Sequence, residues 1–179
     1  RNYVLCFGDK IANVHNSANT RGAFGFESKT RITDIGDGSS NTILMSEQGG
    51  NATATSFRGL GAQSVSGLNT NPSGCLATST NGNYTVSVQT ARPLTALWHS
   101  GLAAHVGFQT VLPPNSPNCL NDNWGDNWSL TSATSYHTGG VNAVMGDGSV
   151  RFIPNGIDAG SSTAAEPTGG LSPYGVWGA

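Results

Sequence analysis

The sequence predicts a strongly β-rich domain of the α+β class, in which short strands are joined by turns and long loops. Only 10% of the 179 residues are charged, whereas soluble proteins average about 25%. Helices normally cover their solvent face with Glu, Lys and Arg, so a chain with so few of them is not mainly helical. Gly contributes 25 residues, which indicates many turns. We expect one domain over residues 1–179, with at most one core helix.

The first half of the chain contains two predicted strands. Tyr3–Phe7 is a short apolar run that ends at a Gly-Asp turn. Ile43–Glu47 follows a polar turn, and a short apolar run bounded by turn residues is typical of a buried strand. Residues 51–85 match neither the helical nor the strand period, so we expect a long surface excursion there.

The second half begins with two weaker strand predictions. Residues 84–88 alternate Tyr and Val with Thr and Ser, which indicates an exposed strand. Residues 105–112 place apolar side chains at Val106, Phe108 and Val111 and predict another strand.

A β-hairpin near the C-terminus is the best-determined element. Val141–Met145 is apolar and β-branched, and Val150–Ile153 alternates between two faces. Asp147 and Gly148 lie between these runs and accept the positive φ angles of a tight turn. An Asp-Gly pair in this setting is a strong hairpin signal, and it predicts an antiparallel sheet.

Charge and hydropathy exclude several functions. The net charge is −2 and no basic stripe exists, which argues against a nucleic-acid partner. No apolar run reaches the 18 to 20 residues of a membrane span. The sequence contains no G-x-S-x-G elbow, no convincing carboxylate pair and no phosphate-binding loop, so we expect no enzymatic activity.

The three cysteines form no C-x-x-C pair, which disfavours a zinc site. Cys75 and Cys119 both lie in loop-like contexts, whereas Cys6 lies between two apolar residues. We favour a Cys75–Cys119 disulfide with a buried Cys6, although other pairings remain open. A disulfide and a polar, neutral surface both suit an extracytoplasmic protein.

His137 and Asp147 are the pair that most invites a catalytic interpretation, and a metal-dependent enzyme that uses them is the weakest alternative. A His that enters a hairpin can instead hydrogen-bond the turn carboxylate or a turn carbonyl and fix the loop. We therefore assign His137, Asp147 and Gly148 to the shape of the hairpin. We expect neither His137 nor Asp147 to face an open catalytic pocket.

Two further groups of side chains suggest ligands. Asp34, Asp37 and Asn41 offer hard oxygen ligands around one turn, so calcium is the metal that fits best, although no complete EF-hand loop is present. Trp124 and Trp128 lie among Asn and Asp, and flat rings with polar neighbours suit sugars. A carbohydrate-binding surface module with a polysaccharide partner is therefore the alternative function, although a core position is the usual one for Trp.

Four stretches of the sequence resemble motifs of one family, in the same order. They are Asp37–Leu44 with Glu47, the mid-chain Cys75–Ala77, the proline-rich loop of residues 110–119, and His137 followed after nine residues by Asp147–Ile153. Together they cover nearly the whole chain. On these motifs the chain is similar to planctomycete-type prepilin-like proteins with a C-terminal H-X9-DG motif.

The resemblance implies a non-enzymatic structural subunit of a cell-surface fibre or secretion apparatus. Its fold would be the antiparallel, long-looped head of a type IV pilin or type II secretion pseudopilin, carried on an N-terminal hydrophobic helix. That helix is not part of this sequence, so we expect Arg1 to be a cut end and membrane contact to occur only through the helix. The implied partners are copies of itself or related pilin-like subunits, at the cell surface or in the periplasm. Major pseudopilins bind calcium in a head-domain loop, which adds weight to the calcium prediction.

Overall fold

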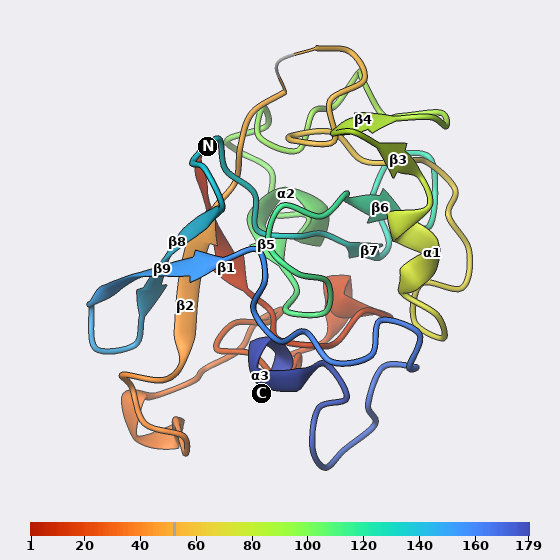
Figure 1. The fold of residues 1–179 in the computed structure, drawn as a ribbon. Helices are drawn as coiled ribbons and strands as arrows, with labels where there is room; N and C mark the ends of the chain where they lie inside the picture. The colour runs from red at the N-terminus through yellow and green to blue at the C-terminus, as the bar shows by residue number, and fades with distance from the viewer. Residues whose placement is uncertain (52) are drawn as a thin grey trace.

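A five-stranded sheet organises the computed structural model, which describes residues 1–51 and 53–179 (Figure 1). The strand order is β5-β1-β2-β8-β9, and every neighbouring pair is antiparallel except β1 with β5. The strands are β1 (Tyr3–Cys6), β2 (Ile43–Glu47), β5 (Gly107–Phe108), β8 (Gly140–Met145) and β9 (Val150–Pro154).

The remaining elements are short. Two small antiparallel pairs are β3 (Ser79–Thr80) with β4 (Asn83–Tyr84), and β6 (Cys119–Leu120) with β7 (Ser129–Leu130). Three helices of four residues each are α1 (Ser73–Leu76), α2 (Ala103–Val106) and α3 (Gly175–Gly178), and 3-10 turns form at Val14–Asn16 and Ile32–Asp34. The β-rich class predicted from composition is therefore confirmed. Among the described residues, no helix is long and apolar enough to cross a membrane.

The strongest local patterns gave the correct strands. β2 has the predicted bounds, and β1 ends one residue before the predicted Phe7. The hairpin pairs Val144 with Val150, and Gly148 adopts a φ of 83° in its turn. Figure 1 shows the β8–β9 hairpin projecting from the body of the molecule.

The two weaker strand predictions are largely wrong. Of residues 84–88, only Tyr84 belongs to a strand, and Val88 makes a single bridge to Ala62. Residues 105–112 begin inside α2 and contribute only the two residues of β5 to the sheet. α2 ends before Gly107, whose backbone lies so close to the Phe7 ring that an added Cβ would be 2.1 Å from a ring carbon.

The two faces of the sheet have different surroundings. Val4, Ser46 and Ala143 are opposite one another in register and are buried. This inner face packs against Phe108 and, from α3, Trp177. Successive residues of a strand point to opposite faces. The residues adjacent in sequence to these buried ones therefore form an outer face.

A second and larger core lies beside the sheet and corrects the expectation for residues 51–85. Instead of a surface excursion, this segment supplies buried Phe57, Leu60 and Leu68 to the largest apolar cluster. Tyr84 closes the cluster, and its hydroxyl donates to the Asn118 carbonyl at 2.6 Å. Such a core has no periodic signature, because loops rather than regular strands deliver its side chains.

The disulfide joins two parts of this second core. Cys75 in α1 and Cys119 in β6 are fully buried and bonded, with Cα atoms 5.8 Å apart, so the predicted pairing is confirmed. Cys6 is buried and unpaired, also as predicted, and burial raises the pKa of its thiol to about 12. The Cys6 thiol is therefore protonated and unreactive at neutral pH.

Candidate functional site

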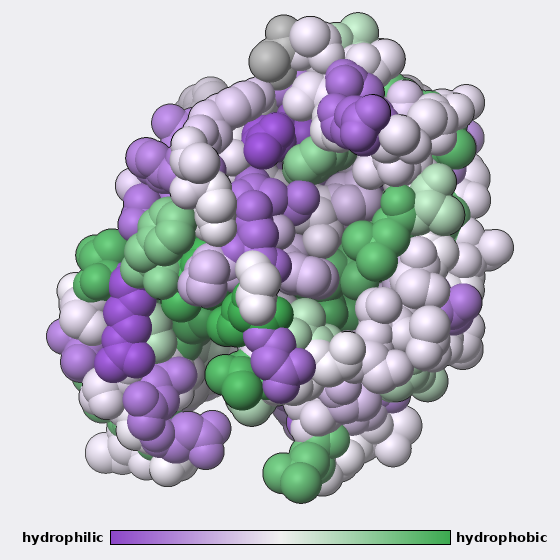
Figure 2. Space-filling model, in the orientation of Figure 1, coloured by the Kyte–Doolittle hydropathy of each residue, from purple (hydrophilic) through white to green (hydrophobic). Residues whose placement is uncertain are grey.

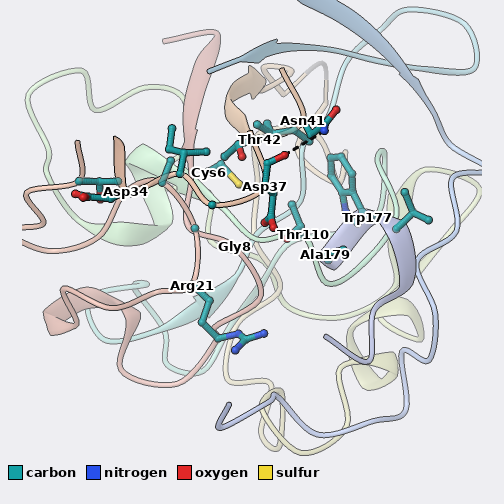
Figure 3. A pocket seen from close by; sticks show the side chains of 18 residues that line it. Cys6, Gly8, Arg21, Asp34, Asp37, Asn41, Thr42, Thr110, Trp177 and Ala179 are labelled. Atoms are coloured by element: carbon teal, nitrogen blue, oxygen red, sulfur yellow. Dashed lines mark hydrogen bonds between the residues drawn. The ribbon is translucent and has the colours of Figure 1, made fainter. Parts of the chain in front are cut away.

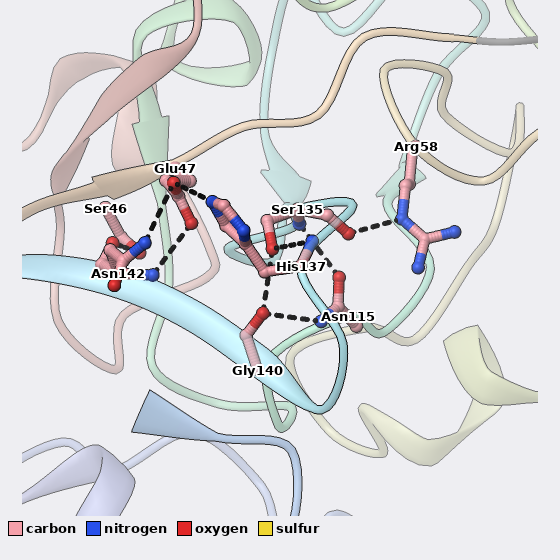
Figure 4. Close-up of polar contacts among 8 residues, drawn as sticks. All are labelled: Ser46, Glu47, Arg58, Asn115, Ser135, His137, Gly140 and Asn142. Atoms are coloured by element: carbon pink, nitrogen blue, oxygen red, sulfur yellow. Dashed lines mark hydrogen bonds and ion pairs between the residues drawn. The ribbon is translucent and has the colours of Figure 1, made fainter. Parts of the chain in front are cut away.

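Glu47, at the end of β2, is the centre of a polar network that joins the motif segments (Figure 4). Its Oε1 lies 3.1 Å from His137 Nε2 and 3.2 Å from the side-chain nitrogen of Asn142. Its Oε2 accepts the Asn142 backbone N–H at 2.8 Å. The Glu47 side chain is 13% exposed and that of His137 58% exposed. Two sequence motifs, one ending in Glu47 and one beginning at His137, therefore meet here.

The prediction that His137 contacts the hairpin turn is wrong. Among the described residues, the His137 ring is hydrogen-bonded to Glu47 instead. His137 precedes β8 and Asp147 follows it, and a six-residue strand spans about 20 Å, so the two side chains lie at opposite ends of the strand. The nine residues between His137 and Asp147 therefore contain the whole of β8. Asp147 instead accepts hydrogen bonds from the N–H and hydroxyl of Ser149, which hold the pKa of its carboxyl below the usual range.

The turn itself is held by the loop that precedes β2. The Gly146 N–H donates to the Thr42 carbonyl at 2.8 Å, and the Asp147 N–H donates to the Ser39 carbonyl at 3.1 Å. The Asp-Gly motif before β2 and the Asp-Gly turn of the hairpin therefore contact each other through backbone hydrogen bonds. Gly146 is required there, because an added Cβ would lie 2.8 Å from the Ser39 carbonyl oxygen.

Asn115 brings the proline-rich motif to the start of β8, near His137. Its side-chain oxygen accepts the Ser135 N–H at 2.8 Å, and its nitrogen donates to Asn155 beyond β9 at 2.8 Å. Asn115 has a φ of 61°, a left-handed conformation that Asn tolerates better than most residues. The proline-rich motif is visible in the sequence, but the role of Asn115 is not, because its partners are 20 and 40 positions away.

Replacing Glu47 by Ala is expected to destabilise the fold by about 2–3 kcal/mol, because the Asn142 N–H loses its acceptor in a half-buried position. Replacing His137 by Ala should cost about 1 kcal/mol or less, since the imidazole is 58% exposed and a contact made by such a side chain contributes little. Urea unfolding of both variants measures the difference. Equal losses would show that the imidazole, rather than the N–H group of β8, is the important partner of Glu47.

The three residues predicted to bind calcium, Asp34, Asp37 and Asn41, line one pocket of about 210 Å³, where two of them make local hydrogen bonds. Asp34 uses its Oδ2 to accept the Arg31 N–H at 2.8 Å, and Asn41 donates to the Asp37 carbonyl at 3.1 Å. Figure 3 shows Asp34 apart from Asp37. The described residues contain no group of three His, Cys, Asp or Glu side chains that could hold a metal ion. Calcium binding at Asp34, Asp37 and Asn41 stays a prediction.

A cleft separates this loop from the C-terminal segment (Figure 3). The pocket drawn there has a volume of about 210 Å³, and its walls include Asp37, Asn41 and Trp177. An adjoining hollow of about 770 Å³ shares Arg21 and Asp37 with it and also includes Arg151. The Arg21 guanidinium donates to Asp9 at 2.6 Å and to the Gly170 carbonyl at 2.9 Å. Arg21 thus ties the C-terminal segment to the body of the molecule.

The two Trp residues predicted to bind sugars have different surroundings. Trp128 is half-buried and packs against two apolar clusters, as core Trp residues do. Trp124 is 45% exposed, and the Arg92 guanidinium lies over its ring at 4.7 Å from the centroid. The Trp124 ring is therefore already stacked on one face, and sugar binding by this pair stays a prediction.

A separate hollow, of about 410 Å³, opens where His137 meets the end of β2. His137 lines it together with Tyr3, Gln48 and Tyr136. His137 therefore faces an open hollow, and the expectation that it faces no catalytic pocket stays a prediction. No candidate nucleophile is hydrogen-bonded to the His137 ring among the described residues, where Glu47 is its partner.

His105 in α2 is the other histidine with a distinct environment. It is fully buried, its Nδ1 lies 3.3 Å from the Leu94 carbonyl oxygen, and its Nε2 has no partner among the described residues. Burial lowers the pKa of this imidazole.

Because the folded state prefers neutral His105, stability should be constant above the ordinary His pKa of about 6.5 and fall as the pH drops below it. His105→Asn keeps a donor for Leu94 and cannot titrate in this range, so its unfolding free energy should change less between pH 7.5 and pH 5. Urea unfolding at both pH values tests this, with exposed His99→Asn as the control. Parallel pH profiles for the wild type and His105→Asn would contradict the expectation.

Comparison with known proteins gives one match. A family model described as "Protein of unknown function (DUF1559)" matches residues 8–160. No curated protein and no solved structure matches the chain.

Proposed function

The chain belongs to the DUF1559 family of proteins of unknown function, and we propose that it is the extracytoplasmic head of a non-enzymatic, pilin-like structural subunit. The observation that carries this proposal is a row of apolar side chains on the outer face of the five-stranded sheet. An exposed apolar row of this kind is typical of an interaction site.

The outer face contains a row of apolar side chains that crosses four strands. Leu5 is opposite Met45, Met45 is opposite Val144, and Val144 is opposite Val150. The first three are half-buried, and Val150 is 64% exposed. Phe152 adds a ring that is 52% exposed two residues along β9. In Figure 2, hydrophobic side chains gather on the side of the molecule where Figure 1 places β8 and β9.

We propose that an apolar helix of the same protein covers this row. Four strands at about 4.8 Å spacing place the ends of the row about 15 Å apart, which is the length of about ten helical residues. An N-terminal hydrophobic helix is also what the prepilin-like motifs imply. The outer face offers no charged side chain within the row, so an apolar helix is a better match than a polar one.

The hydrogen bonds of the motif residues favour a structural role over a catalytic one. Glu47, Asp147 and Asn115 each accept hydrogen bonds from backbone N–H groups. Each of these side chains therefore holds one segment of the fold against another or shapes a turn. A catalytic carboxylate needs a free oxygen within reach of a substrate, and Glu47 has donors on both oxygens.

The disulfide supports the location that we propose. Cys75–Cys119 lies in the second core, and such bonds form and persist in oxidising compartments. An extracytoplasmic head domain would meet this condition.

Cross-linking in the full-length gene product tests the proposal. A photoreactive amino acid at Val150 should cross-link to an apolar helical segment that precedes Arg1, and mass spectrometry would identify the joined peptides. The matched control places the same amino acid at Val86, which is 45% exposed and lies outside the five-stranded sheet. A full-length product without an apolar helix upstream of Arg1, or cross-links that do not distinguish Val150 from Val86, would overturn the proposal.

A further inference from the structure

The hollow beside His137 combines exposed aromatic rings with polar side chains. It is formed where the chain leaves β2 and where the segment before β8 passes over it. Its volume of about 410 Å³ falls within the range of small-molecule sites. The side chains that line it include those of Asn2, Tyr3, Glu47, Gln48, Tyr136 and His137.

Two tyrosines give the hollow flat apolar surfaces. Tyr3 is 52% exposed and Tyr136 is 60% exposed. The Tyr136 ring is fixed in place, because its hydroxyl donates to the Gly50 carbonyl at 2.6 Å and the Arg58 guanidinium lies 4.9 Å from its centroid. Arg58 is itself held by the Ser135 carbonyl at 2.7 Å. A ring that is positioned before a ligand arrives loses little entropy on binding.

The charges in the hollow are compensated within the protein. Glu47 receives three hydrogen bonds, one of them from the His137 ring. Its negative charge is therefore poorly suited to attract a cation. No Lys or Arg is among the described residues that line the hollow, and the nearby Arg58 guanidinium is already engaged by the Tyr136 ring and the Ser135 carbonyl.

An unsatisfied donor lies in the wall of the same hollow. Gln48 is 3% exposed, and its side-chain nitrogen has no hydrogen-bond partner among the described residues. A buried amide without a partner costs about 1–3 kcal/mol. The nitrogen is shielded from solvent, so the Gln48 side chain would turn toward the hollow for an incoming hydroxyl group to accept its N–H.

We propose that this hollow binds a neutral oligosaccharide. One sugar ring stacks its apolar face on Tyr136, with Tyr3 contacting the same or the next unit, and a hydroxyl accepts the Gln48 N–H. Compensated charge, exposed rings and a free donor together match a polyhydroxylated neutral ligand better than an ion or a purely apolar one. The site is separate from Trp124 and Trp128, and it does not depend on the pilin-like role.

Saturation-transfer NMR with a defined panel of probes tests this inference. The panel contains the neutral pentaoses of cellulose, starch, xylan and mannan, with an acidic oligogalacturonide as the charged comparison. At least one neutral probe should bind the 179-residue chain, and Tyr136→Ala should weaken that binding at least tenfold. Tyr136→Phe, which keeps the ring, should retain most of the affinity, and Trp124→Ala should leave it unchanged.

Thermal melts of each variant ensure that lost binding does not reflect lost folding, and Tyr3→Ala provides a second, exposed ring deletion. Absence of binding by every neutral probe, binding of the acidic probe alone, or a loss in Trp124→Ala that Tyr136→Ala does not reproduce would each overturn the inference. Val150→Ser, on the apolar row, should bind sugar as the wild type does. A failure of the glycan site is therefore distinguishable from a failure of the pilin-like proposal.

Discussion

Replacing Cys75 and Cys119 together by Ala is expected to lower the free energy of unfolding by about 3–4 kcal/mol. The bond closes a segment of 44 residues, and removing it returns the corresponding loop entropy to the unfolded chain. The loss of stability should affect the whole second core. Both sulfurs belong to its main cluster, and the segments around them have little regular structure.

Urea unfolding of the double variant and of the wild type, each with and without reductant, measures this effect. Reductant should shift the wild type to the stability of the variant and leave the variant unchanged. Cys6→Ala is the matched control, because it removes a buried thiol that closes no loop. A double variant within about 1 kcal/mol of the wild type would show that packing alone holds the second core.

Replacing Asn118 by Ala is expected to cost about 3–5 kcal/mol, which makes it the most damaging single polar substitution that we predict. The side chain is fully buried, and its nitrogen donates to the carbonyls of Phe57 and Leu60 at 2.9 and 3.1 Å. Its oxygen accepts the Ser132 N–H at 2.9 Å. Alanine leaves buried backbone groups without partners, at about 1–3 kcal/mol each.

Exposed Asn16→Ala is the control for this substitution, and its unfolding free energy should stay within about 0.5 kcal/mol of the wild type. Urea unfolding compares the two variants directly. If they prove equally stable, the contacts of Asn118 with the backbone do not organise the second core.

The strands that the sequence predicted well are those whose signal is local. β2 and the β8–β9 hairpin each combine an apolar run with adjacent turn residues, so a window of about ten residues contains the whole pattern. The second core has no such window. Phe57, Leu60 and Leu68 share their cluster with Tyr174, more than 100 positions away, and their loop backbone is satisfied by single side chains such as Asn118.

The candidate site was predictable in its parts and not in its contacts. The motif resemblance singled out Glu47, His137 and Asp147, but the hairpin pattern predicted that His137 contacts the turn carboxylate or a turn carbonyl, whereas its partner is Glu47. Strand geometry alone separates His137 from Asp147, because nine intervening residues that include a six-residue strand cannot fold back within hydrogen-bond reach. Finding Glu47 as the partner required the register between β2 and β8, since the two residues are 90 positions apart.

The order of strands in the sheet has a consequence for how the protein folds. β2 lies between β1 and β8, so a strand made early in synthesis is flanked on one side by a strand made about 100 residues later. At 5–20 residues per second, a ribosome needs about 5–20 s to make that stretch. During this interval β2 can pair only with β1, and its second edge is open to other chains. We expect the β8–β9 hairpin to form quickly once synthesised and to close the sheet in a slow step dominated by distant contacts.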